Sequence, residues 1–357
     1  MTNLKIASNA HLNPYAGNIE NYIGFARIPT GLIDSLIVHH RDTSSIIPIP
    51  LTTTEGALVA SYNRGAKAIN AAGGVHALCI DEGIQRVPLF MLENVQSAVH
   101  LSEWLEDQKV NFDKLIPEVS AHAQLKSIDP IVEGNCVNLE LTYTTGDAAG
   151  QNMITFCTRK IGTYIIEHAP VPIREWYIEG NMAGDKKSSA QYLKKVRGKR
   201  VVADITLPKE VVREILKTTP ERLAEYWKRS IVNQVMSHSL GAHGHLANGL
   251  TALFLATGQD VACVSESALG ISRFEVTENG DLYACITMSS LIVGTVGGGT
   301  TLPYAQTNLK TMGCQGKGKA IHFAEIATGL LLAGELSVGA AICEKQFADA
   351  HERLGRA

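Results

Sequence analysis

The stretch PVPIREWYIEGNMAGDKKSS, residues 170–189, determines how the rest of the sequence divides. Prolines open it and glycines interrupt its second half, and both residue types break regular helices and strands. We therefore expect a junction here, with a middle unit before it and the remainder of the chain after it. No repeat of fixed period and no low-complexity linker accompanies this junction.

Patterns on both sides of the junction mix helix and strand. Alternation of β-branched and aromatic residues predicts strands in NCVNLELTY (135–143), GTYIIEHAPV (162–171) and DLYACITMSS (281–290). Apolar spacing of three and four residues predicts helices over 205–236, over 245–260 and from about 322 to 354. Small residues in the last helix would let neighbouring backbones approach closely. The fold class is α/β, with an α+β arrangement.

Composition limits the function. The 357 residues are 45% apolar and 19% charged, which is typical of a folded chain of roughly two domains. The formal charge of -3 argues against a nucleic-acid partner. Seven scattered cysteines without CxxC spacing indicate reduced thiols rather than a zinc site. Because the sequence has no signal peptide and no run of about 20 apolar residues, we expect a cytoplasmic protein without a membrane partner.

Four segments combine many small residues with polar groups. They are TTTEGALVASYNRGAKAIN (52–70), TTGDAAGQNM (144–153), NMAGDKKSS (181–189) and GTVGGGTTLP (294–303). Glycine allows a ligand to approach the backbone closely, although any single stretch of this kind is more often purely structural. Four together favour a site. The second segment lacks GxGxxG, so an ordinary Rossmann domain is not supported.

In this order, the four segments resemble the signature stretches of 3-hydroxy-3-methylglutaryl-CoA reductases, in particular the class I catalytic portion without its membrane anchor. The match runs from ENYIGFARIPTG (20–31) to His351 and includes DKK and GQD. The resemblance implies reduction of the thioester by two hydrides, from NADPH or NADH, to mevalonate and CoA. It also implies three parts: a large mixed helix/sheet substrate and CoA domain (1–87 and 189–357), an inserted ferredoxin-like cofactor domain (88–177) and a catalytic connecting loop (178–188).

The resemblance assigns four catalytic residues. Lys186 would stabilise the oxyanion on the substrate carbonyl, and Glu55 would donate a proton, for which burial or a second carboxylate must raise its pKa. Asp260 would lie between these two side chains and tune both. His351 would protonate the departing CoA thiolate, a duty that suits imidazole. Without the motifs, each residue is at least as well explained by a solvated surface or helix-end position.

Further positions match binding residues of the family. For substrate and CoA they are Arg86, whose guanidinium would hold the substrate carboxylate, with Asp185, Lys187, Asn248, Ser61, Asn63, Arg64 and His245. For the cofactor they are Ser120, Asp147, Ala148, Gly150, Asn152 and Val296. The family also implies a homodimer or homotetramer with shared active sites, because the connecting loop completes the site of a neighbouring subunit.

Three departures leave details open. Ala121 replaces the arginine that would pair with a 2′-phosphate, so the choice between NADPH and NADH is undetermined. Glu179 replaces a serine that contacts substrate in the family. The loop MSHSLGAHGHLAN (236–248) is rich in histidine, but without a carboxylate or cysteine to complete a ligand set we expect no metal. The alternatives are a reductase of another acyl-CoA or carrier-bound thioester and a non-catalytic acyl-CoA-binding relative.

Overall fold

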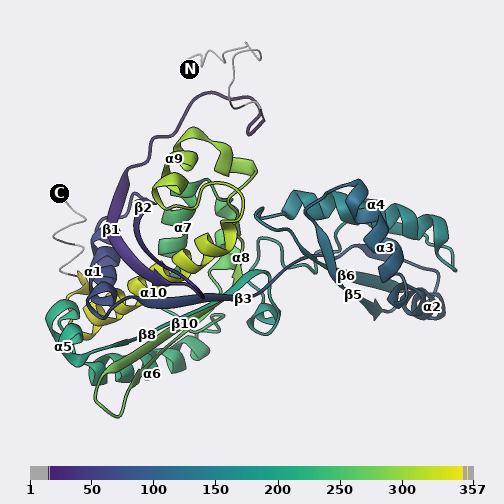
Figure 1. Ribbon diagram of the computed structural model, residues 1–357. Helices are drawn as coiled ribbons and strands as arrows, with labels where there is room; N and C mark the ends of the chain where they lie inside the picture. Colours follow the sequence, from purple (N-terminus) through teal and green to yellow (C-terminus); the bar gives the residue numbers. More distant parts are fainter. Residues whose placement is uncertain (1–14, 16, 349–351, 353–357) are drawn as a thin grey trace, which may run out of the picture.

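The computed structural model describes residue 15, residues 17–348 and residue 352, and these form two lobes (Figure 1). The larger lobe contains the first and the last described segments of the chain. The smaller lobe is built from the middle of the chain and stands to one side of the larger one. The mixture of helices and strands agrees with the α/β fold class predicted from the sequence.

A single sheet organises the larger lobe. Its strands, in spatial order, are β2 (Ser44–Thr52), β1 (Thr30–His39), β3 (Val75–Arg86), β8 (Gly198–Leu207), β10 (Leu282–Leu291) and β9 (Gly270–Val276). The short β1–β3 pairing is parallel, and the other pairings in this series are antiparallel. The prediction of a strand over 281–290 is confirmed by β10.

Helix α10 (Ala320–Cys343) lies at the centre of the larger lobe, against β3, β8 and β10. By length and hydropathy this helix could span a membrane, but 89% of its most apolar window is buried inside the protein. Helix α1 (Leu58–Ala71) crosses it closely: a Cβ on Gly65 would lie 1.9 Å from the Ala333 carbonyl oxygen. A Cβ on Gly334 would lie 2.4 Å from the Tyr62 ring. The predicted close approach at small residues is confirmed.

The remaining helices of the larger lobe show one difference from the sequence prediction. They are η3 (Ala190–Leu193), α5 (Lys209–Val211), η4 (Val212–Leu216), α6 (Pro220–Met236), α7 (Leu246–Thr257), η5 (Val261–Cys263), α8 (Val264–Ser267), η6 (Gly298–Thr301) and α9 (Pro303–Thr311). The single helix predicted over 205–236 is wrong. Residues 205–207 belong to β8, and the rest is divided where Lys217 takes a left-handed conformation and where Pro220 disfavours helix at Thr219, which instead caps α6.

The smaller lobe has the element order β-α-β-β-α-β. Its elements are β4 (Leu89–Met91), α2 (Val95–Glu106), α3 (Lys109–Leu115), η2 (Ile116–Glu118), β5 (Gln124–Glu133), β6 (Cys136–Thr144), α4 (Gln151–His168) and β7 (Glu175–Tyr177). The strands lie in the order β7-β4-β6-β5 and pair antiparallel. This element order is typical of ferredoxin-like units. The sequence boundaries 88 and 177 fall next to β4 and at the end of β7, while the division into domains stays a prediction.

The predicted strand over 162–171 is wrong, because most of it belongs to α4. The buried residues of α4 recur at helical spacing, as Ile154, Cys157, Ile161 and Ile165 show. The alternation that suggested a strand covers only residues 162–171, whereas the helical spacing of apolar residues extends over the whole of α4. The strand predicted over 135–143 and the helix predicted over 245–260 are confirmed by β6 and α7.

Strand β3 takes part in both sheets. Residues His76 to Gly83 pair with β8, and Ile84 to Arg86 pair with β6 of the smaller lobe. The chain returns to the larger lobe through residues 178–189, between β7 and η3. Arg86 therefore lies where the two lobes meet.

Candidate functional site

Lys186 and Asp260 form an ion pair at the surface. Lys186 takes a left-handed conformation, φ 55°, in the loop before η3, and its Nζ donates to Asp260 Oδ2 at 2.8 Å. The side chains are 44% and 49% exposed. The hydrogen bond to Asp260 raises the pKa of Lys186. Partial burial acts to raise the pKa of Asp260, but the Lys186 ammonium lowers it overall. This pair presents a fixed cation that solvent and ligands can reach.

The backbone holds Asp260 in place. Gly258 ends α7 in the left-handed conformation, and the Gln259 amide bonds back to the Phe254 carbonyl oxygen. Asp260 then caps η5, because its Oδ1 accepts the Ala262 amide proton at 3.1 Å. The carboxylate keeps its other oxygen for Lys186. Its position is thus determined before any ligand binds.

Glu55 and Asn248, each predicted separately from the sequence, form a second hydrogen-bonded pair at the other end of α7. The Asn248 amide donates to Glu55 Oε1 at 3.4 Å, and the Glu55 backbone N–H donates to Thr53 Oγ1 at 3.0 Å. Asn248 lies in the first turn of α7, so the helix separates it from the turn before Asp260 by roughly 14 Å at 1.5 Å per residue. Within the described chain, Asp260 contacts Lys186 and not Glu55. His351 lies outside the described residues.

Behind the surface pair lies a buried network of ions. Arg86, only 6% exposed, donates through Nη1 to Asp185 Oδ2 at 3.2 Å. Asp185 Oδ1 accepts from Arg197 Nη2 at 3.3 Å, and the Arg197 Nε–H donates to Glu266. Burial acts against the charge on Arg197, but the carboxylate of Glu266 raises its pKa overall. This network attaches the connecting loop to the core.

Glu179 accepts a hydrogen bond from the guanidinium of Arg86, the group that was predicted to bind the substrate carboxylate. Its Oε2 accepts from Arg86 Nη1 at 3.2 Å and from the Val87 amide at 3.3 Å. The Ala183 amide donates to Oε1 at 3.4 Å. Arg86 Nε is buried and has no hydrogen-bond partner in the described part of the chain. Arg86 Nη2 donates to the Gln151 carbonyl oxygen at 3.4 Å, so a substrate carboxylate would have to use the second Nη2 proton or Nε, or displace Glu179 or Asp185.

Three of the predicted CoA contacts, Ser61, Asn63 and Arg64, lie on α1, and two of them bond to Ser337 of α10. Ser61 Oγ and Ser337 Oγ are 2.9 Å apart, and Arg64 donates to Ser337 through Nε at 3.0 Å and Nη2 at 2.6 Å. Burial lowers the pKa of Arg64. Asn63 instead donates to Asp34 at 3.2 Å. Lys187 donates only to the Asp185 carbonyl oxygen, at 3.0 Å, among its described contacts.

A cavity of about 410 Å³ lies beside His245, between α6, β9 and α10. Glu335 fixes the backbone at the edge of this cavity, because its carboxylate accepts the amide protons of Gly244 at 2.6 Å and His245 at 2.7 Å. Trp227 Nε1 and His243 Nδ1 line the cavity, are buried and have no hydrogen-bond partner among the described residues. Sequence reasoning missed Glu335 and Trp227, although a glutamate within an apolar helix, in AGELS, was a usable signal.

Two of the predicted cofactor residues, Asp147 and Val296, are in contact, and Asp147 binds the start of α10. The Asp147 carboxylate accepts three amide protons, from Gly318 at 2.7 Å and from Lys319 and Ala320 at 3.0 Å. Its carbonyl oxygen accepts from Thr295 at 2.8 Å and Val296 at 3.4 Å. The sequence-distant loops 146–150 and 294–300 are therefore adjacent.

The other predicted cofactor residues lie in two places. Gly150, φ 86°, is the residue before α4, and Asn152 is exposed in the first turn of that helix. Ala148 also lies against the second loop, since a Cβ on Gly294 would be 2.9 Å from its carbonyl carbon. Ser120 is elsewhere: its Oγ accepts the amide protons of His122 at 3.1 Å and Ala123 at 3.3 Å in the turn before β5.

The fold agrees with that of solved coenzyme A thioester reductases. A 3-hydroxy-3-methylglutaryl-coenzyme A reductase of Streptococcus pneumoniae superposes with a TM-score of 0.72 at 17% identity, over 91% of this chain and 87% of that one. A class II enzyme from the same organism, bound to NADPH in open conformations, also gives 0.72, at 18% identity over 91% and 88% of the two chains.

Sequence similarity then establishes the family. Residues 2–356 match the hydroxymethylglutaryl-coenzyme A reductase family model. The 3-hydroxy-3-methylglutaryl-coenzyme A reductase of Pyrococcus horikoshii is 43% identical over 350 residues, 95% of this chain and 84% of that one. That of Aeropyrum pernix is 41% identical over 348 residues, 96% and 82% of the two chains. The chain belongs to the hydroxymethylglutaryl-coenzyme A reductase family, which confirms the resemblance seen in its motifs.

Proposed function

We propose that this protein reduces 3-hydroxy-3-methylglutaryl-CoA to mevalonate and free CoA in two hydride transfers. The observation that carries the proposal is the ion pair between Lys186 and Asp260, 2.8 Å apart and open to solvent. Relatives at 41% and 43% identity carry the reductase name, which supports the same substrate here.

Lys186 would stabilise negative charge on the substrate carbonyl oxygen in both reductive steps. Preorganised charge of this kind is commonly the largest catalytic term, and removal of one such donor costs roughly 10²–10³ in kcat. Asp260 keeps the ammonium charged and oriented. Glu55 would supply a proton to the reduced carbonyl, and His351, assigned from the sequence, would protonate the CoA thiolate as it leaves.

A nicotinamide cofactor would supply the hydrides. The residues around Asp147 fit such a ligand, because the first turn of α4, after Gly150, offers amide groups to a pyrophosphate. The glycine-rich loops 146–150 and 294–300 lie side by side there and let a ligand approach the backbone. A related solved enzyme is bound to NADPH. With Ala121 in place of the phosphate-binding arginine, we leave NADH and NADPH as the two candidates.

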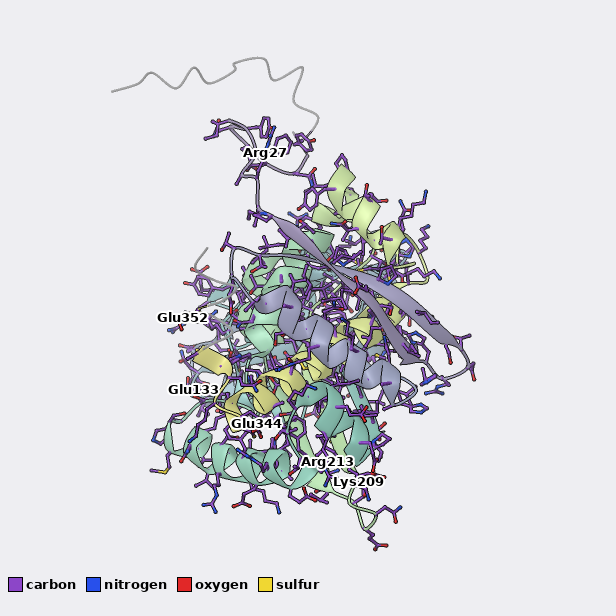
Figure 2. The ribbon with its side chains drawn as sticks, turned by 90° about the vertical axis from the view of Figure 1, so that its left-hand side faces the viewer. Arg27, Glu133, Lys209, Arg213, Glu344 and Glu352 are labelled. Atoms are coloured by element: carbon purple, nitrogen blue, oxygen red, sulfur yellow. The ribbon has the colours of Figure 1, made fainter. Side chains whose placement is uncertain are left out.

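We also propose a homodimer or homotetramer whose active sites are shared between subunits. The Lys186–Asp260 and Glu55–Asn248 pairs lie at opposite ends of α7, and the length of that helix between them, roughly 14 Å, favours a site that a second subunit completes. A symmetric partner can bring the second pair to the first. The segment that carries Arg27 projects from the larger lobe (Figure 2) and exposes Ile23 and Phe25 to 71% and 63%, which favours burial against a partner.

Mixing two inactive variants tests the shared site. Lys186→Ala and Glu55→Gln subunits are unfolded together, refolded and compared with each variant refolded alone. If the two residues of one site come from different subunits, random pairing restores about one quarter of wild-type activity, since half the dimers are mixed and each has one intact site. Activity that stays at the level of the separate variants would rule out sharing of these two residues.

The reaction itself is tested by the oxidation of NADH and of NADPH with 3-hydroxy-3-methylglutaryl-CoA, followed by absorbance, while a thiol reagent measures released CoA. We expect two equivalents of one cofactor consumed per CoA and no reaction by Lys186→Ala. A folded, oligomeric protein that consumes neither cofactor would contradict the substrate assignment.

A second substrate class is favoured by the Glu179–Arg86 contact, at 3.2 Å. If Glu179 stays in place, the site would suit an acyl-CoA or carrier-bound thioester without a free carboxylate, and the same assay with acetyl-CoA and longer acyl-CoAs tests this. A protein that only binds acyl-CoA would have no need for the Lys186–Asp260 pair.

The buried α10 also supports a cytoplasmic location for the enzyme.

A further inference from the structure

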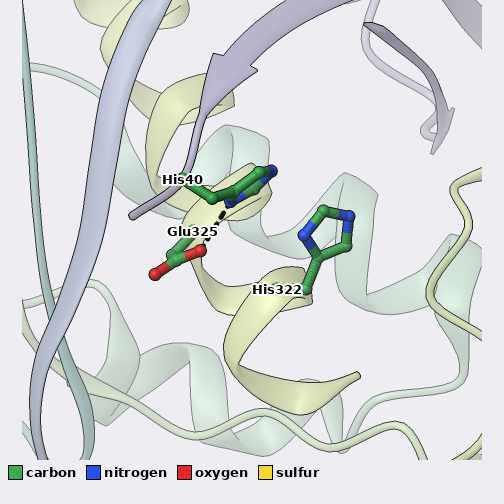
Figure 3. A group of neighbouring side chains, drawn as sticks. All are labelled: His40, His322 and Glu325. Carbon is green, nitrogen blue, oxygen red and sulfur yellow. Dashed lines mark hydrogen bonds and ion pairs between the residues drawn. The ribbon is translucent and has the colours of Figure 1, made fainter. Parts of the chain in front are cut away.

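A group of titratable side chains lies away from the predicted catalytic pairs, at the first turns of α10 (Figure 3). His40 follows β1, and His322 and Glu325 are one helical turn apart on α10. One nitrogen from each imidazole and one carboxylate oxygen all lie within 4.8 Å of one another. His40 Nδ1 is 2.6 Å from Glu325 Oε2, and the two rings are 4.1 Å apart between centroids.

The side chains of His40 and Glu325 are buried, and one ring nitrogen of His40 has no hydrogen-bond partner among the described residues. The His40 side chain is 6% exposed and that of Glu325 8%. His40 Nε2 is buried and has no hydrogen-bond partner among the residues that the structure describes. Burying a polar nitrogen without a partner is costly, so this imidazole has not satisfied its full bonding capacity in the described structure.

The neighbours orient the group for a cation. Glu325 Oε1 accepts the Cys79 amide proton at 3.0 Å, which fixes the carboxylate and leaves Oε2 to face His40. The His40 amide donates to the Thr43 carbonyl oxygen at 2.8 Å and holds the β1–β2 turn. Supporting contacts of this type commonly orient metal ligands.

We propose that His40, His322 and Glu325 form a binding site for a divalent transition-metal ion of the zinc type. Two imidazoles and one carboxylate are a donor set that zinc uses, with a water molecule in the fourth position. Zinc ligands lie about 2.0–2.2 Å from the ion, so the three donor atoms must come to about 3.3 Å from one another. The His40 Nδ1–Glu325 Oε2 pair, 2.6 Å apart, therefore opens as the ion replaces its proton, and the widest separation, up to 4.8 Å, closes by roughly 1.5 Å, both within the reach of side-chain rotation.

The proposal changes the expectation of no metal that was based on the histidines at 238–245. His40 and Glu325 are 285 residues apart in sequence, so no spacing pattern could have joined them. A bound ion would tie the β1–β2 turn to the start of α10, the same helix start that the Asp147 carboxylate caps. We therefore expect the ion to act on the stability of this region, and the proposal does not depend on the reaction catalysed.

Metal binding is measured on the full chain after treatment with a chelator. Zn²⁺ is titrated by calorimetry, and Co²⁺ is titrated as a spectroscopic probe of the ligand set. The variants are His40→Phe, His322→Phe and Glu325→Gln, with His100→Phe, an exposed histidine on α2, as the matched control. Circular dichroism of each metal-free variant establishes that it is folded.

We expect one equivalent to bind, with an increase in melting temperature and a Co²⁺ spectrum typical of nitrogen and oxygen ligands. Each cluster variant should weaken binding by more than the roughly 10–100-fold that loss of an outer partner costs, and His100→Phe should not change it. Binding that survives in His322→Phe or Glu325→Gln, a thiolate charge-transfer band, or no binding at all would overturn the proposal. If His40→Phe does not fold, the other two variants decide the matter.

Discussion

Asp185 and Lys186 are adjacent in the connecting loop, yet they belong to regions of opposite character. Asp185 joins Arg86 and Arg197 in a buried network, in which Arg197 is fully buried. Lys186 points to a surface where it and Asp260 are nearly half exposed. Ion pairs therefore serve two purposes in this loop. The buried network around Asp185 positions the loop, and the exposed Lys186–Asp260 pair remains available to a ligand. Three changes test this division, and a fourth gives the scale of a carboxylate that belongs to neither region.

The largest effect on stability is expected from Arg197→Leu. Removing one member of a buried ion pair leaves an uncompensated charge, here on Glu266, at a cost of about 3–5 kcal/mol. Urea unfolding measures the loss. Lys109→Gln, which breaks an exposed pair with 44% exposed partners, should cost less than about 1 kcal/mol. Equal losses for the two variants would remove the distinction between the regions.

Lys186→Ala should affect catalysis without affecting the fold. We expect kcat to fall by about 10²–10³, because the donor that stabilises the oxyanion is lost. The free energy of unfolding should change by less than about 1 kcal/mol, since the pair is exposed. Lys194→Ala, another exposed lysine nearby, should leave both quantities unchanged. A variant that unfolds easily but keeps its kcat would assign Lys186 to the structural network instead.

Glu179→Ala tests whether the buried network competes with substrate. It frees Arg86 from one of the two carboxylates on Nη1. The KM for 3-hydroxy-3-methylglutaryl-CoA should fall about 3- to 10-fold, the worth of roughly one hydrogen bond to a charged group. Steady-state kinetics measure this, and Glu175→Ala, at an exposed glutamate of β7, should have no effect. A higher KM in Glu179→Ala would mean that this carboxylate assists binding.

Asp147→Asn should give the smallest effect, about 1 kcal/mol of unfolding free energy at pH 7, the usual value for a helix cap. Partial burial acts to raise the pKa of Asp147, but the amides of residues 318–320 lower it overall. Its contribution is therefore complete above the ordinary aspartate pKa and is lost as pH falls through the lowered one. Urea unfolding at pH 7 and pH 3 should show a difference between wild type and variant that shrinks at the lower pH.

The sequence predicted the parts of this fold that depend on local pattern. The strands β6 and β10 and the helix α7 follow from apolar spacing within a few residues. The helix break at Thr219–Pro220 and the identity of α4 were missed. At Thr219–Pro220, a single proline interrupts an amphipathic pattern that otherwise predicts one long helix. In α4, a short alternation of residues was interpreted as a strand although the longer spacing is helical.

The candidate site shows the same limit. Motifs named Lys186, Asp260 and Arg86, and the first two are indeed in contact. The partners that determine what each can do, such as Glu179 on Arg86 or Ser337 on Arg64, are brought by folding from distant positions. The group at His40 had no motif at all, because its members meet only when the β1–β2 turn packs on α10.

Strand β3 gives the molecule a mechanical property. Since its first part is bonded into the larger sheet and its last three residues into the smaller one, neither lobe can melt without disturbing a strand that the other needs. The strand is therefore a structural element that the two lobes share, and it ends at Arg86. The two lobes should lose their structure in one cooperative step on heating, and separate transitions for the two lobes would contradict this coupling.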